Sequence, residues 1–357
     1  MIKHNSIYFV IILWIAIFVG NDLEGQDASF SQNYASPLYL SPSFTGLTDG
    51  SRLALHYRDQ WPGIPGTYKT MSFAFDHFIS DFNSGVGVQF YRDDAGKGLL
   101  INQNIGLLYA YEIYVSDKVM VRPGLQFLLA QSFIDPSKGV LGSLINRQDG
   151  TPLTGASFPT ERDKTNRFDA AASVMIYSNF YWGGVTVDHL VKNNIGFTDI
   201  ETNTNMKITA FGGYKWVYKE GRRRMPDQSI TFAFNYRKQA DFNQVDLGAY
   251  WVYNPIEIGL WYRGMPSANQ EGLGNQDAVI AILGVHLGQM RLGYSFDLTL
   301  SELAGNTGGS HELSIMYTIP SSNKPKINRS AIPCSVPGYS GGGASRSKYR
   351  SRSRRIF

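Results

Sequence analysis

The sequence predicts an all-β protein, a transmembrane antiparallel β-barrel of about fourteen strands. Three observations lead to this prediction. Short segments throughout the chain alternate apolar and polar residues with a period of two, the pattern of a strand with one apolar face. No segment after the leader shows the stripe of an amphipathic helix. No apolar run after residue 20 approaches the ~18 residues that a membrane-spanning helix needs.

Composition excludes two further classes. Hydrophobic residues make up 43% of the 357 residues and aromatic residues 13%, so the chain collapses around a core and is not disordered as a whole. The single cysteine, Cys334, has no partner within the chain, which excludes a disulfide-stapled scaffold.

The first 25 residues read as a signal peptide. Lys3 and His4 precede an uncharged apolar run at 7–19, which has the length of a signal-peptide core. A polar, Gly-containing stretch follows, and we expect cleavage after Gly25. The alternatives are a buried hydrophobic helix or an uncleaved anchor. No cysteine lies near the boundary, so a lipoprotein is not expected, and the protein is predicted to be exported.

Fourteen segments are predicted as strands, which gives ~21 residues per strand and connection, as in outer-membrane barrels. In the segment 229–237, for example, Phe232 and Phe234 share one face, and Thr231 and Asn235 share the other. An even strand count places both ends of the barrel chain on one side, the periplasm in bacterial barrels. The segments are 52–58, 70–78, 84–91, 99–114, 118–131, 167–178, 180–188, 206–218, 229–237, 244–253, 256–262, 276–287, 290–299 and 313–319.

The two faces of these strands differ in chemistry. One is rich in Gly, Ser, Thr, Gln and charged residues and suits a wet or polar-packed lumen, so the apolar face is expected to meet lipid. The alternative is an extracellular propeller or sandwich, but no repeat of about 40 residues is present. Two long polar segments, 132–166 and 189–204, are expected to be extracellular loops. Aromatic pairs expected at the lipid interfaces are Tyr109/Tyr111, Trp216/Tyr218, Trp251/Tyr253 and Trp261/Tyr262.

The sequence contains no recognisable motif for catalysis or for metal or cofactor binding. The five histidines after the leader have no metal-site spacing, and no nucleophile elbow, phosphate loop or zinc-protease motif occurs. Ser310 and His311 are adjacent on a predicted strand, so their side chains point to opposite faces and cannot act together. We therefore expect no catalytic residue, no metal and no cofactor.

The C-terminal region 320–357 carries nine Lys and Arg residues and no acidic residue, so the sequence pI near 8.9 reflects this tail. We expect a flexible periplasmic arm that contacts an anionic periplasmic partner or lipid headgroups, and not nucleic acid. The alternative is a solvated tail without function. Its six most closely spaced cations are Arg346, Lys348, Arg350, Arg352, Arg354 and Arg355.

Several segments together resemble the PorP/SprF family of outer-membrane proteins, which belong to the type IX secretion and gliding system of the Bacteroidetes. These are QDASFSQNYASPLYLSPSFTG at 26–46, YRDQWPGIPGTYKTMSFAFDH at 57–77, GLWYRG at 259–264 and YSFDLTLSELAGNTGGSHELSIMY at 294–317. Ile332-Pro333-Cys334 also resembles a common family ending. The resemblance covers residues 26 to 334 in the right order, and the basic tail departs from it.

The resemblance implies a non-enzymatic outer-membrane barrel that works with other type IX secretion components. Such a barrel would anchor a large adhesin-like surface protein with a type B C-terminal signal, or assist its export. A passive channel for small solutes is the alternative, and a soluble extracellular β-domain is a third reading.

The expected organisation is a signal peptide at 1–25, an extended lead-in at 26–50 that plugs or lines the lumen, a barrel at 51–319 and the tail at 320–357. The residues expected to bind a partner or to shape the lumen are Arg58, Asp59, Gln60, Trp61, Asp297, His311 and Glu312.

Overall fold

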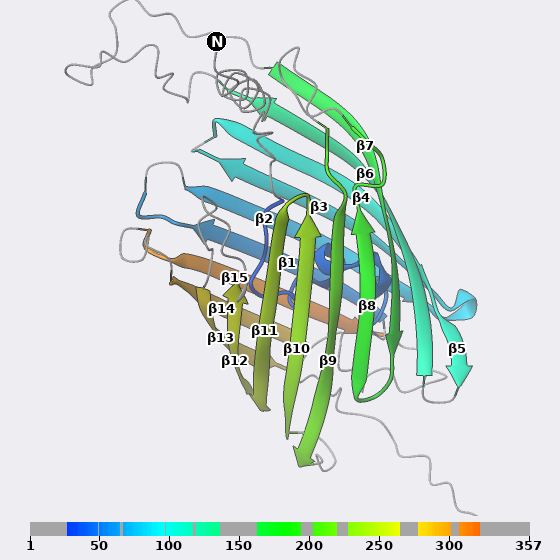
Figure 1. The fold of residues 1–357 in the computed structure, drawn as a ribbon. Helices are drawn as coiled ribbons and strands as arrows, with labels where there is room; N and C mark the ends of the chain where they lie inside the picture. Colours follow the sequence, from blue (N-terminus) through cyan, green and yellow to red (C-terminus); the bar gives the residue numbers. More distant parts are fainter. Residues whose placement is uncertain are drawn as a thin grey trace, which may run out of the picture.

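The computed structural model describes ten ranges of the chain, and the strands within them form one antiparallel barrel (Figure 1). The described ranges are 27–48, 50–64, 67–96, 98–116, 119–135, 163–193, 203–219, 228–264, 278–300 and 307–321. The strands are β1 (Gly50–Gln60), β2 (Tyr68–Ile79), β3 (Ser84–Ala95), β4 (Leu100–Tyr111), β5 (Ile113–Ser116), β6 (Val119–Ile134), β7 (Asp163–Tyr177), β8 (Tyr181–Asp188), β9 (Lys207–Lys219), β10 (Gln228–Gln239), β11 (Phe242–Tyr253), β12 (Ile256–Gly264), β13 (Ala278–Leu287), β14 (Met290–Thr299) and β15 (Ser310–Pro320).

The ring closes without a free edge, as a strand-built membrane protein requires. Each long strand pairs with its neighbours in sequence, and β1 pairs with β15. The four-residue strand β5 only extends the pairing of β6, while β4 pairs directly with β6. Within the described part of the chain, fourteen strands therefore make the ring, as the alternation predicted.

All fourteen predicted segments fall on strands, with differences at their ends. β6 continues to Ile134 and β7 begins at Asp163, so the loop expected at 132–166 is shorter at both ends. Residues 136–162 of that loop lie outside the described residues, as do 194–202 of the second expected loop. The signal peptide and residues 322–357 of the predicted tail lie outside them too, whereas Pro320, its first residue, is the last residue of β15. Among the described residues, no helix has the length and apolar character needed to cross a membrane.

The outer face carries the large apolar side chains and the inner face the polar ones, as expected. On β10, Phe232 is 52% exposed, whereas the side chains of Thr231 and Asn235 are buried. The prediction that Trp261 faces lipid is wrong, because this residue lies inside the barrel and is only 2% exposed. Its neighbour Leu260 faces outward, so the period of two turns Trp261 inward.

The chain enters the barrel from the end opposite to the one at which β1 begins. We call the end at which β1 begins and β15 finishes the turn end, because connections such as 288–289 are short there, and the opposite end the loop end. Asp27 contacts Lys207, the first residue of β9, and Gln239, the last residue of β10, so it lies at the loop end. The chain then crosses the lumen lengthwise to reach Gly50 at the turn end.

Residues 27–48, here called the plug, fill the lumen. The lead-in was expected to be extended, but it contains the helical turn α2 (Pro37–Leu40) and the 3-10 turn η1 (Pro42–Phe44). A proline stands at the first position of each turn, where its missing N–H is tolerated. The central layer of the lumen is apolar, because plug side chains pack there against inward-facing wall residues. This layer includes Tyr34, Leu38, Phe44 and Leu47 of the plug and Trp182, Phe211, Tyr250 and Trp261 of the wall.

Candidate functional site

A buried ion-pair cluster joins the plug to the seam between the first and last strands. The register places Arg58 of β1 opposite Glu312 of β15, and their inward side chains form an ion pair. The Glu312 carboxylate also accepts the backbone N–H groups of Ser31 at 2.5 Å and Gln32 at 3.1 Å. The Ser31 hydroxyl donates to Asp297 at 2.6 Å, and Arg58 pairs with the same carboxylate at 2.9 Å. Charged groups thus satisfy main-chain donors of the plug in a site that is almost completely buried.

The cluster extends across the barrel wall through alternating charges. His56 contacts one carboxylate oxygen of Glu312 at 2.9 Å, and Arg58 binds the other. Arg263 of β12 lies 3.3 Å from Asp297 and 3.1 Å from Asp246 of β11. Asp246 is in turn 2.7 Å from Arg237 of β10. The charges therefore compensate one another from β1 to β10, as buried charges must.

Two further arginines hold the plug near the turn end. The Arg52 guanidinium pairs with Asp76 at 2.9 Å and donates to the Phe44 carbonyl at 3.1 Å. The other carboxylate oxygen of Asp76 accepts the Gly46 N–H at 2.7 Å. Arg52 and Asp76 thus bind one carbonyl and one amide of the same plug turn.

Arg122 of β6 makes an equivalent contact from another part of the wall. It pairs with Glu112 at 2.6 Å and donates to the carbonyl groups of Ser43 and Thr45. Ser43 lies within η1 and Thr45 follows it, so no helix continues far enough to satisfy these carbonyls. The wall therefore supplies the hydrogen bonds that the short plug turns cannot make internally.

Glycines in the wall allow the plug backbone to approach closely. A Cβ at Gly85 would lie 1.9 Å from the Thr45 carbonyl oxygen, and a Cβ at Gly124 would lie 2.5 Å from the Ser43 nitrogen. Any side chain at either position would displace the plug. By contrast, a Cβ at Gly183 would meet its nearest neighbour, the Phe211 carbonyl oxygen, at 3.6 Å.

A mixed-charge clamp holds the start of the plug at the loop end. Asp27 lies 2.9 Å from His189 and 2.7 Å from Lys207, and the other His189 nitrogen lies 2.6 Å from Asp169. Burial opposes the charged form of Asp27, but Lys207 and His189 outweigh it and hold its pKa well below the usual range. Burial likewise disfavours protonated His189, but Asp27 and Asp169 raise its pKa to about 10. Both groups are therefore charged near neutral pH.

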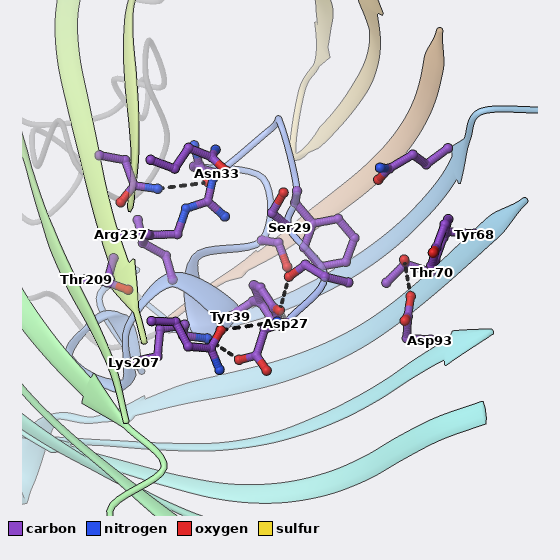
Figure 2. Close-up of a pocket in the computed structure, with 18 of the residues that line it drawn as sticks. Asp27, Ser29, Asn33, Tyr39, Tyr68, Thr70, Asp93, Lys207, Thr209 and Arg237 are labelled. Carbon is purple, nitrogen blue, oxygen red and sulfur yellow. Dashed lines mark hydrogen bonds and ion pairs between the residues drawn. The ribbon is translucent and has the colours of Figure 1, made fainter. Parts of the chain in front are cut away.

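Above the plug at the loop end lies a cavity of about 380 Å³. Figure 2 shows Thr70 and Asp93 on one side of it, Lys207, Thr209 and Arg237 on the other, and the plug between them. Trp61, Tyr68 and Phe242 come from strand ends at the mouth. The arrangement is that of a small, largely polar pocket whose floor is the chain's own N-terminal segment.

The structure brings together some of the residues predicted for the site and separates others. Arg58, Asp297 and Glu312 meet in the seam cluster, and Gln60 accepts a hydrogen bond from Arg58 at 3.2 Å. Trp61 follows β1, with a backbone φ of 59°, and its ring packs edge-on against Tyr68.

Asp59 and His311 do not join the cluster. They face each other in the register between β1 and β15, but their positions alternate with those of Arg58 and Glu312, so they lie on the outer side of the strands. His311 contacts the Tyr294 hydroxyl at 2.8 Å. The cations of the predicted basic tail lie outside the described residues.

Sequence reasoning missed several members of the site. His56 precedes Arg58 by two positions, so alternation already placed it on the same face. Arg263 lies within the GLWYRG motif, but nothing local pairs it with Asp246 or Asp297. Among the described residues, no group of three or more His, Cys, Asp or Glu side chains could hold a metal ion.

The sequence model of one protein family, described as type IX secretion system membrane protein PorP/SprF, matches residues 22–317 of the chain. The chain belongs to the PorP/SprF family. A membrane barrel of this family fits the outer membrane, with apolar side chains on its outer face and polar ones inside. Among curated proteins, none matches the chain.

Several solved barrels are similar to this PorP/SprF family member at low identity. A Pseudomonas aeruginosa FadL homologue is 12% identical, with a TM-score of 0.42 over 75% of this chain and 89% of that one. The TodX deltaS2S3 mutant monoaromatic hydrocarbon channel is 10% identical, with a TM-score of 0.44 over 83% and 98%. CdiB from Acinetobacter baumannii is 7% identical, with a TM-score of 0.43 over 76% and 60%.

Proposed function

We propose that this protein is a non-enzymatic, plugged barrel that anchors a large secreted surface protein, or assists its export, in type IX secretion. The partner would be an adhesin-like protein with a type B C-terminal signal, and the role would support gliding motility. The observation that carries the proposal is the way the plug is built into the wall. Such a barrel offers a fixed platform whose loop end faces a partner.

The plug argues against a passive channel for small solutes. Its main chain is bound by Glu312, Asp76, Arg52 and Arg122, and glycines in the wall are fitted to it. Removing it would break these hydrogen bonds to buried charged groups and would separate Asp27 from Lys207 and His189, which is unfavourable. A steady aqueous pore would require that cost at every opening, whereas a platform uses the plugged state as it stands.

The loop end offers the contacts that a protein partner needs. Trp61 is held there because its backbone N–H donates to the Gly309 carbonyl at 2.9 Å and its ring packs against Tyr68. A rigid aromatic residue beside a polar cavity is a common anchor in protein interfaces. The Trp61 loop is therefore the proposed contact region on the barrel.

The other regions complete the proposal. Residues 1–25 act as the export signal, and the tail at 320–357 contacts anionic groups on the periplasmic side. Since β15 ends at the turn end, the tail continues from the side on which β1 begins.

Two measurements test the proposed function. In a planar bilayer, the purified protein should show no large, steady conductance steps, and such steps would instead support the channel. In cells, deletion of the gene should release the surface protein into the medium or abolish its secretion. Normal surface display in the deletion strain would contradict the proposal.

A further inference from the structure

The cavity at the loop end contains polar groups that the fold does not use. Asn33 of the plug and Asn235 of β10 are 7% and 2% exposed. Within the described structure, the Asn33 Nδ2, the Asn235 Oδ1 and the Arg237 Nε have no hydrogen-bond partner. All three residues line the cavity. Buried polar atoms left unpaired are costly, so a cluster of them beside a cavity indicates a ligand that pairs with them.

The charge of the lining does not favour an anionic ligand. Two cations, Lys207 and Arg237, and two acids, Asp27 and Asp93, contribute to it. Lys207 is neutralised by Asp27 at 2.7 Å and Asp188 at 3.3 Å, and Arg237 by Asp246. No uncompensated cation remains to select a phosphate or a carboxylate, and Asp93 accepts a hydrogen bond from the Thr70 hydroxyl at 2.7 Å. The unused groups are two donors and one acceptor, so they match a neutral ligand that both accepts and donates hydrogen bonds.

The same wall already binds polypeptide main chain with a carboxamide. Gln239 accepts the backbone N–H of Asp27 at 3.2 Å through its Oε1 and donates to the Asn205 carbonyl at 3.5 Å through its Nε2. The Tyr39 hydroxyl donates to the carbonyl of Ala28. Asn235 donates from its Nδ2 to the Asn33 Oδ1 at 3.5 Å, which leaves the Asn33 Nδ2 and the Asn235 Oδ1 to bind a second main-chain segment in the same manner.

We infer that this cavity binds a short, uncharged segment of a polypeptide through its main-chain amides, with Asn33, Asn235 and Arg237 as the contact residues. The inference rests on the proposed function, because it names the part of the secreted partner that the barrel holds. The aromatic side chains of Trp61, Tyr68 and Phe242 flank the entering segment. The plug forms the floor, so the site exists only while the lumen is closed.

The test uses the purified full-length protein in detergent and three blocked tetrapeptides, acetylated and amidated at their ends. One consists of Ser, Asn, Gly and Thr, and the other two carry Asp or Lys in place of Asn. Titration calorimetry measures the affinity of each. The uncharged peptide should bind saturably and more tightly than either charged one.

Two variants probe the contacts, and one variant serves as a control. Asn235→Leu removes the acceptor, and Arg237→Lys keeps the charge opposite Asp246 but removes the Nε–H. Each variant should bind the uncharged peptide with about tenfold lower affinity, as expected for one lost hydrogen bond in a desolvated site. Asn104→Leu replaces an asparagine that does not line the cavity and should leave the affinity unchanged. Heat-modifiable migration on gels confirms that each variant is folded.

Three results would overturn the inference: no saturable binding of the uncharged peptide, equal affinity in all variants, or Asn235-dependent binding of maltotriose in its place. The last would assign the cavity to a saccharide. None of these results bears on the conductance or the surface-display measurement, so the proposed function stands or fails separately.

Discussion

Arg58 and Glu312 pair across the seam that closes the barrel, and the same carboxylate binds two main-chain amides of the plug. Closure of the ring and closure of the lumen therefore depend on one buried group. Since β1 and β15 are the first and last strands, this contact forms only when the whole barrel chain is in place. The plug is thus locked at the step that completes the fold.

Replacing Glu312 by Gln should loosen the plug. The substitution leaves Arg58 without its nearer counter-charge and His56 without its carboxylate, and breaking a buried pair in this way costs about 3–5 kcal/mol. Part of that cost is relieved if the segment around Ser31 leaves the lumen. We expect conductance steps in planar bilayers that the parent protein does not show.

Glu257→Gln is the matched control for this experiment. Glu257 is also fully buried and pairs with one arginine and one histidine, Arg291 and His286, but its hydrogen bonds go to the wall and not to the plug. The Glu257→Gln variant should lose a similar amount of thermal stability but should show no conductance steps. Equal conductance in both variants would show that general destabilisation, and not the plug contact, opens the lumen.

Alanine at Gly85 or Gly124 should also displace the plug, through sterics alone. The added Cβ would overlap the backbone of Thr45 or Ser43, which cannot move without breaking its bonds to Arg122. Limited chymotrypsin digestion, followed by mass spectrometry, should detect cleavage after Tyr34 in these variants only. Gly183→Ala adds the same methyl group at a position where there is room for it. Cleavage after Tyr34 in this variant as well would contradict the interpretation.

The strands could be predicted from the sequence because alternation is a local property. The placement of Trp261 was wrong because its aromatic character suggested the lipid interface, whereas its position between Leu260 and Tyr262 decides its direction. The seam cluster could not be assembled, since Arg58 and Glu312 are far apart in sequence and meet only through the register. The turns of the plug were likewise hidden, because their backbone groups are satisfied by arginines of the wall.

Trp61→Ala should reduce retention of the surface protein and leave the barrel intact. Trp61 follows β1, and its half-buried indole packs on Tyr68 at the start of β2, so its loss removes a contact at the mouth and not a strand residue. The assay compares cell-bound with released surface protein, alongside heat-modifiable migration. Trp216→Ala, on the outer face, controls for loss of an aromatic residue and should retain the partner. Unchanged retention in Trp61→Ala would remove this loop from the proposed contact region.

The His189 clamp should make the stability of the plug depend on pH in the alkaline range. The pKa of His189 is raised to about 10 in the fold, above the ordinary value near 6.5, so the fold favours the protonated ring. Its stabilisation is fully present below about pH 6.5 and is lost as the pH rises through about 10. Asp27, with its lowered pKa, stays charged throughout this range.

His189→Asn isolates this contribution. His189 has a backbone φ of 59°, and asparagine tolerates this left-handed conformation, so the variant removes the charge without adding backbone strain. The midpoint temperature of the heat-induced gel shift should be a few degrees higher in the parent protein at pH 6, and the two proteins should converge by pH 10.5. Groups that titrate elsewhere affect both proteins alike and cancel in the difference. A difference that stays constant from pH 6 to pH 10.5 would mean that His189 stabilises the plug by packing and not by its charge.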